Sequence, residues 1–127
     1  MSMNKKIILV VEDEKDMQFA IKLQLEANDF EVLTADDGHA ALDKARKSKP
    51  DLIVLDVMLP KVDGYKVCRM LKFDEKYKKI PIIMLTARVQ QNDEKIGLEV
   101  GADRYLTKPF EPGVLLKTIK NLLKIEQ

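Results

Sequence analysis

Short apolar runs alternate with longer charged segments along the chain, and this alternation restricts the fold more than any other feature of the sequence. The apolar runs predict strands at residues 7–11, 31–35, 52–57, 82–86 and 104–107. Three of them (IILVV, LIVLDV apart from its Asp, and IIML) are continuously apolar rather than alternating. Such runs are typical of parallel strands that are covered on both faces.

The segments between these runs have helical periodicity. In the first of them, Met17, Ile21 and Leu25 form one apolar stripe. We predict helices at residues 16–28, 39–47, 65–73, 93–100 and 114–125. Five strand-then-helix units indicate an α/β fold, a doubly wound parallel sheet of five strands with five helices in three α/β/α layers. Because the chain has 127 residues and no internal repeat or linker, we expect residues 1–127 to form one domain without an effector domain.

The composition excludes several classes of function. There are 22 Lys and Arg against 21 Asp and Glu, a formal net charge of +1, so we expect no direct binding of nucleic acid. Cys68 is the only cysteine and His39 the only histidine, which excludes a disulfide within the chain and zinc sites built from these residues. The first apolar run is shorter than an export signal, and no run approaches the length of a membrane span. We therefore expect a cytoplasmic protein without membrane contact.

Polar and charged residues stand at the carboxyl ends of the predicted strands. Glu12 and Asp13 follow the first strand, and Asp56 interrupts the third run near its end. Thr86 ends the fourth strand, and Lys108 follows the fifth. Since ligands bind at the carboxyl edge of open parallel sheets, we expect these five residues to meet at one edge.

Three carboxylates at one edge repel one another, by roughly 4 kcal/mol for a pair 4 Å apart at an effective dielectric constant near 20. A hard divalent cation relieves this repulsion, and Mg²⁺ binds one or two carboxylates together with waters and phosphate oxygens. With one Mg²⁺ and Lys108, the three acids form a neutral pocket that suits an arriving phosphoryl group. Because carboxylates can form aspartyl phosphates, the pattern favours an aspartate that accepts phosphate.

Five stretches carry a resemblance to a known family, in the family's order and over nearly the whole chain. They are ILVVEDE at 8–14, PDLIVLDVMLP at 50–60, DGY at 63–65, PIIMLTA at 81–87 and GADRYLTKPF at 101–110. With these stretches the sequence resembles the receiver domain of response regulators, the phospho-accepting module of two-component signalling. The resemblance implies a flavodoxin-like sheet with the strand order 2-1-3-4-5.

The resemblance also implies roles for single residues. Asp56 is the residue that accepts a phosphoryl group, from the phosphohistidine of a histidine kinase or from a small phosphodonor. Mg²⁺ is bound by Asp13, Asp56 and the backbone carbonyl of Met58, while Glu12 acts largely through water. Lys108 is one of two residues that hold the phosphoryl group. The domain is then a switch that assists its own phosphorylation and dephosphorylation, and not an enzyme with an external product.

Thr86 is the other residue implied to hold the phosphoryl group, and Tyr105 is the switch aromatic that turns inward as Thr86 moves. The Lys108–Pro109 bond is cis in the family. The implied partners are a histidine kinase or phosphotransfer protein, a downstream target or an effector domain, and a second copy in a phosphorylation-dependent homodimer. The implied output face consists of residues 93–100, 104–107 and 114–125.

Two other functions stay open from the residues alone. A small Mg²⁺-dependent phosphohydrolase could use Asp56 as its nucleophile, although such enzymes usually have a second acid two residues on, where this chain has Met58. A flavin or nucleotide carrier can have the same fold, but acids at the sheet edge would repel an anionic cofactor. Taken singly, Asp56 is compatible with a hydrogen-bonded strand residue and Lys108 with a surface lysine.

Overall fold

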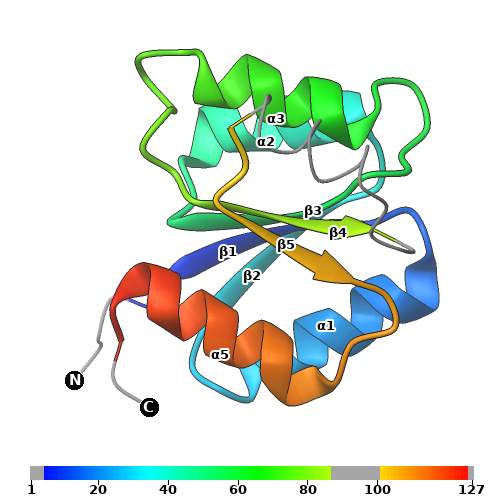
Figure 1. Cartoon of the computed structure of the whole chain (residues 1–127), viewed down its shortest axis with the longest axis vertical. Helices are drawn as coiled ribbons and strands as arrows, with labels where there is room; N and C mark the ends of the chain where they lie inside the picture. Colours follow the sequence, from blue (N-terminus) through cyan, green and yellow to red (C-terminus); the bar gives the residue numbers. More distant parts are fainter. Residues whose placement is uncertain (1–4, 87–100, 126–127) are drawn as a thin grey trace.

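The computed structural model describes residues 5–86 and 101–125 and shows one parallel sheet between two layers of helices (Figure 1). The strands are β1 (Ile7–Val11), β2 (Glu31–Ala35), β3 (Leu52–Asp56), β4 (Ile82–Thr86) and β5 (Arg104–Thr107). Their order is β2-β1-β3-β4-β5, and every neighbouring pair is parallel. The predicted doubly wound, flavodoxin-like sheet is confirmed, with β3 one residue shorter than predicted.

The described helices are α1 (Lys15–Glu26), α2 (Gly38–Ser48), α3 (Gly64–Lys72) and α5 (Pro112–Leu123). Each overlaps a predicted helix, and the ends differ by one or two residues. The carboxylates of Asp37 and Asp63 accept the backbone N–H groups of Ala40 and Lys66, both at 2.9 Å, and so fix where α2 and α3 begin. The predicted helix at 93–100 lies outside the described residues.

Successive residues of the central strands point into two separate cores. Leu9 and Val11 of β1 pack on the side of α2 and α3, while Ile8 and Val10 pack on the side of α1 and α5 (Figure 1). All four side chains are fully buried. The continuously apolar runs are therefore explained by a sheet that is covered on both faces.

The register of the sheet brings the polar strand ends to the same level. Pairing of β1 with β3 makes Glu12 and Asp56 leave adjacent strands side by side. Pairing of β4 with β5 sets Thr86 beside Thr107, so that Lys108 follows directly at this edge. The fold thus gathers residues from distant parts of the chain at the carboxyl edge.

Candidate functional site

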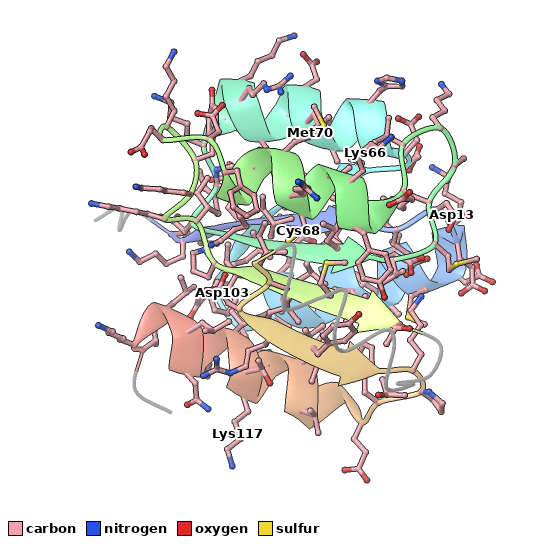
Figure 2. The ribbon with its side chains drawn as sticks, turned by 45° about the horizontal axis from the view of Figure 1, so that its top comes forward. Asp13, Lys66, Cys68, Met70, Asp103 and Lys117 are labelled. Atoms are coloured by element: carbon pink, nitrogen blue, oxygen red, sulfur yellow. The ribbon has the colours of Figure 1, made fainter. Side chains whose placement is uncertain are left out.

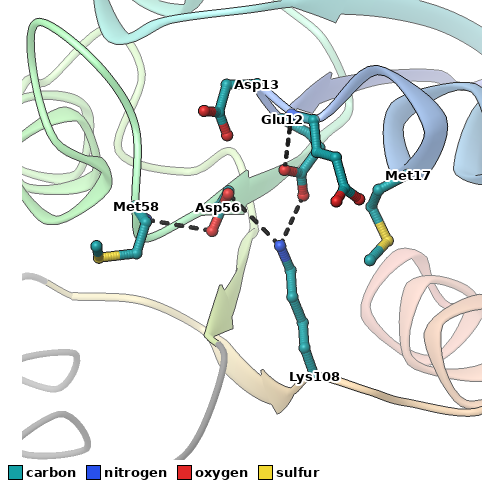
Figure 3. Close-up of a pocket in the computed structure, with 7 residues that line it drawn as sticks. Glu12, Asp13, Met17, Asp56, Met58 and Lys108 are labelled. Atoms are coloured by element: carbon teal, nitrogen blue, oxygen red, sulfur yellow. Dashed lines mark hydrogen bonds and ion pairs between the residues drawn. The ribbon is translucent and has the colours of Figure 1, made fainter.

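A cleft of about 400 Å³ opens at the carboxyl edge of the sheet (Figure 3). Its lining comes from the end of β1 and the start of α1, from the end of β3, and from the residue after β5. The lining residues are Glu12, Asp13, Glu14, Met17, Asp56, Met58 and Lys108. All the residues predicted to bind metal, together with the predicted lysine, therefore lie in one cleft.

Three carboxylates meet in this cleft. Carboxylate oxygens of Glu12, Asp13 and Asp56 lie within 4.8 Å of one another. Glu12 and Asp56 are buried, with exposed fractions of 1% and 4%, whereas Asp13 is exposed to solvent. Oxygen donors at this spacing, with one donor open to water, fit a hard divalent cation such as Mg²⁺.

Lys108 lies against the two buried acids (Figure 3). Its Nζ is 2.8 Å from Oε1 of Glu12 and 3.5 Å from Oδ2 of Asp56. Burial raises the pKa of Glu12; the hydrogen bond from Lys108 opposes this rise and the charge of Asp56 adds to it. Burial acts to lower the pKa of Lys108, but the contacts with Glu12 and Asp56 outweigh burial and raise it. Lys108 is therefore a fixed positive charge in the cleft.

Asp56 is oriented by the loop that follows it. Its Oδ1 accepts the backbone N–H of Met58 at 3.1 Å, so Oδ2 is the oxygen nearer to Lys108. The Met58 side chain is 72% exposed and forms the rim of the cleft. The backbone N–H of Gly64, the first residue of α3, donates to the carbonyl of Val57 at 3.0 Å. The loop that carries the acid is therefore attached to the start of α3.

Two further predicted site residues lie outside the lining of the cleft. Thr86 is buried at the end of β4, and its carbonyl accepts the backbone N–H of Lys108 at 2.6 Å. Tyr105 lies on β5, and its hydroxyl forms a 2.6 Å hydrogen bond with the hydroxyl of Tyr65 on α3. The Lys108–Pro109 peptide bond is cis, as the resemblance implies. Of the implied output face, the structure describes β5 and α5.

Gln18 and Tyr65 are not among the predicted site residues, although both make polar contacts with residues of the predicted site. Gln18 of α1 is buried, and its Nε2 donates to the carbonyl of Glu12 at 2.9 Å. Tyr65 holds the hydroxyl of Tyr105. Neither contact has a signal in the sequence, because each joins a helix side chain to a group on or next to a strand, and their proximity depends on how the helix packs against the sheet.

Comparison with known proteins shows which family combines this sheet with this cleft. A family model described as the response regulator receiver domain matches residues 8–120, a range that includes every residue lining the cleft. The chain belongs to the response regulator receiver domains. Its acids and lysine therefore occupy the carboxyl edge of a receiver fold.

Individual receiver proteins agree with this assignment. The alkaline phosphatase synthesis transcriptional regulatory protein PhoP of Bacillus subtilis is 49% identical over 122 residues, which make up 96% of this chain and 50% of that protein. This receiver chain thus spans about half the length of the curated relatives it matches.

Solved receiver structures show the same architecture. A putative response regulator from Chloroflexus aurantiacus has a TM-score of 0.90 at 36% identity, with 95% of this chain and 99% of that chain covered. The receiver domain of a sensor histidine kinase from Pseudomonas aeruginosa, solved with a magnesium ion coordinated in its active-site cleft, has a TM-score of 0.88 at 32% identity, with 95% and 99% covered. Within residues 5–86 and 101–125, no helix is long and apolar enough to cross a membrane.

Proposed function

We propose that this receiver is a phosphorylation-activated switch of a two-component system, with Asp56 as the residue that accepts the phosphoryl group. The observation that carries the proposal is the placement of Asp56, a buried carboxylate at an open cleft between Lys108 and two further acids. The magnesium ion in the cleft of the Pseudomonas aeruginosa receiver supports a metal-assisted function at this edge.

The geometry around Asp56 suits phosphoryl transfer. Because Oδ1 accepts the N–H of Met58, Oδ2 is the oxygen that is available to attack phosphorus. As the new P–O bond forms, the P–N bond of a phosphohistidine donor breaks, and the imidazole nitrogen keeps the electron pair. Lys108, 3.5 Å from Oδ2, supplies positive charge beside the transferred group. We assign to Thr86 the donation of a hydroxyl hydrogen bond to a phosphoryl oxygen.

The acids of the cleft are the proposed ligands of Mg²⁺. Asp13 and Asp56 would bind it directly, together with the backbone carbonyl of Met58. Glu12 is held by Lys108 at 2.8 Å, which supports an indirect role through water. Bound there, the ion supplies charge neutralisation for the phosphoryl oxygens.

A receiver of this kind transmits its state to other proteins. We propose a histidine kinase or phosphotransfer protein as the donor, and a downstream target, an effector domain or a second copy of the chain as the recipient. The name of PhoP, a transcriptional regulatory protein of twice this length, supports an effector function in the whole protein. Tyr105, on β5 of the implied output face, is the proposed switch residue. The cytoplasmic location, the single domain over 1–127 and the absence of direct nucleic-acid binding by this chain stay predictions.

Intact-mass measurement after incubation with acetyl phosphate and Mg²⁺ tests the acceptor. We expect one added phosphoryl group on the natural chain, none on Asp56→Asn, and one on the control Asp43→Asn, whose carboxylate pairs with Lys47 on the surface of α2. No adduct on the natural chain would contradict the phospho-accepting function. An adduct that persists in Asp56→Asn would show that another residue is the acceptor.

A further inference from the structure

Gln18 reaches back from α1 to the strand end that carries two of the acids. Its side chain is 9% exposed, and its Nε2 donates to the carbonyl of Glu12 at 2.9 Å and to Oδ1 of Asp36 at 2.8 Å. The carbonyl of Ala35 lies at 3.3 Å from the same nitrogen. One buried amide therefore joins the carboxyl ends of β1 and β2 to the helix that follows β1.

The peptide group that Gln18 holds is the one between the two acids. The carbonyl of Glu12 belongs to the Glu12–Asp13 peptide bond, so any rotation of this group moves both side chains. On the other side of the residue, the backbone N–H of Glu12 donates to the carbonyl of Ala35 at 3.1 Å. Both backbone polar groups of Glu12 are thus hydrogen-bonded. Its N–H continues the pairing of β1 with β2, and its carbonyl accepts from the side chain of Gln18.

Two further hydrogen bonds join residues of the same turn. The backbone N–H of Gln18 donates to the carbonyl of Glu14 at 3.0 Å, and the N–H of Glu14 donates to Oε2 of Glu12 at 3.2 Å. Outside the turn, Asp36 is also held by Lys15, with Nζ 2.8 Å from Oδ2. Asp36, which accepts a hydrogen bond from the Gln18 amide, is therefore itself held by an ion pair. This second contact restricts the movement of the Gln18 side chain.

We propose that Gln18 is a positioning residue for the divalent cation, because it sets the peptide orientation that keeps the carboxylates of Glu12 and Asp13 at ligand spacing. The inference rests on the proposed Mg²⁺ site and adds to it a residue that does not touch the metal. Groups that orient metal ligands typically affect metal affinity by 10–100-fold when they are removed. Gln18 acts through the backbone, so we place its effect at the lower end of this range.

Calorimetric titration of the whole chain with Mg²⁺ tests the proposal. Gln18→Met keeps the length and volume of the side chain but removes the amide, and we expect about 10-fold weaker Mg²⁺ binding. Gln24→Met is the matched control, since it makes the same change further along α1 and outside the lining of the acidic cleft; its affinity should equal that of the natural chain. Thermal unfolding in EDTA, measured in parallel, reports any loss of stability separately from affinity.

A second variant keeps the test decisive if Gln18→Met does not fold. Gln18→Asn retains an amide but is one methylene too short to reach the carbonyl of Glu12, so it should also weaken Mg²⁺ binding severalfold. If the folded Gln18 variants bind Mg²⁺ as tightly as the natural chain, the positioning role is wrong and Gln18 is structural only. If the natural chain itself binds no Mg²⁺, the proposed function fails, and the inference fails with it.

Discussion

At the scale of single residues, a metal site is only part of the reason why three acids can lie together in the cleft. Glu12 is 1% exposed, and its carboxylate lies 2.8 Å from Nζ of Lys108. The same nitrogen lies 3.5 Å from Asp56. A buried carboxylate is tolerated when it is paired and hydrogen-bonded, so Lys108 supports two acids before any metal is considered. One ammonium balances only one of the three carboxylate charges, so two negative charges, that of the exposed Asp13 among them, are left for an ion to neutralise.

Replacing Lys108 with Met should therefore destabilise the protein. We expect a loss of about 3 kcal/mol in the free energy of unfolding at pH 7 in EDTA, because one partner of a buried ion pair is left alone. Urea unfolding measures the loss. The control is Lys47→Met, which breaks an exposed pair with Asp43 and should cost less than about 0.5 kcal/mol.

The loss in Lys108→Met should depend on pH in a defined direction. Burial holds the pKa of Glu12 above its usual range, so the folded chain keeps this proton to a higher pH than the unfolded chain. This contribution to the free energy of unfolding is fully present when the pH lies below the carboxyl pKa of the unfolded chain. It disappears as the pH rises through the raised pKa of Glu12 in the folded chain. Without Lys108 the pKa of Glu12 rises further, so the variant should regain stability between pH 7 and pH 5. A deficit that stays the same over this interval would show that Glu12 does not cause it.

Asp13→Ala should have the opposite effect on the metal-free protein. Removing this carboxylate relieves repulsion from Glu12 and Asp56, and the melting temperature in EDTA should rise by about 3 °C for each kcal/mol of relief. Added Mg²⁺, which should raise the melting temperature of the natural chain, should no longer do so in the variant. Differential scanning calorimetry with and without Mg²⁺ measures both effects. A lower melting temperature of the variant in EDTA would mean that the acids do not strain the fold.

At the scale of helices and strands, the sequence predicts most of the architecture because apolar runs reflect burial directly. The predicted bounds of β1, β2, β4 and β5 match the structure. Apolar residues such as Ile8 and Val10 are fully buried in the core, so the apolar run marks the strand directly. Helix ends were predicted less well. Asp37 and Asp63 begin α2 and α3 through side-chain bonds to the backbone, and the stripe of apolar residues does not include such capping residues.

The start of α3 sets the position of the loop that follows Asp56, the proposed acceptor. A Cβ atom on Gly64 would lie 2.2 Å from the carbonyl oxygen of Asp56, whereas a Cβ on Gly113 in α5 has nothing within 4 Å. Gly64→Ala should therefore push α3 away from the end of β3 and cost about 1–3 kcal/mol. Gly113→Ala, the matched control in a helix, should stabilise the chain by about 0.4–1 kcal/mol. Equal effects of the two substitutions on urea unfolding would contradict the close packing at Gly64.

At the scale of the whole molecule, the sequence predicts the acids and the lysine that line the cleft but not the contacts between them. A parallel sheet brings its carboxyl ends together, and this alone places Glu12, Asp56 and Lys108 at one edge. The pairing of Lys108 with Glu12 joins residues 96 positions apart, and it depends on side-chain geometry that no local pattern encodes. The contact of Gln18 with the strand end depends in the same way on how α1 packs.

The rate at which the buried thiol of Cys68 is labelled reports whether the molecule unfolds as one unit. Cys68 lies on α3 (Figure 2) and is fully buried, and burial raises the pKa of its thiol to about 12. The reactive thiolate is therefore suppressed in the folded chain, and labelling with iodoacetamide at pH 8 requires opening of the structure. We expect labelling of the native protein at least about a thousandfold slower than labelling in urea.

The way in which Cys68 becomes accessible can be tested with a distant substitution. Lys108 lies at the sheet edge and contacts Glu12 after β1, Asp56 of β3 and Thr86 of β4, which all lie outside α3. If opening is global, the loss of about 3 kcal/mol in Lys108→Met should speed the labelling of Cys68 by about 100-fold. If α3 opens alone, the labelling rate should be the same in the variant and in the natural chain, because the energy of the acid cluster does not enter the opening reaction. An unchanged rate would therefore show that the core beneath α2 and α3 and the acidic edge of the sheet unfold as separate units.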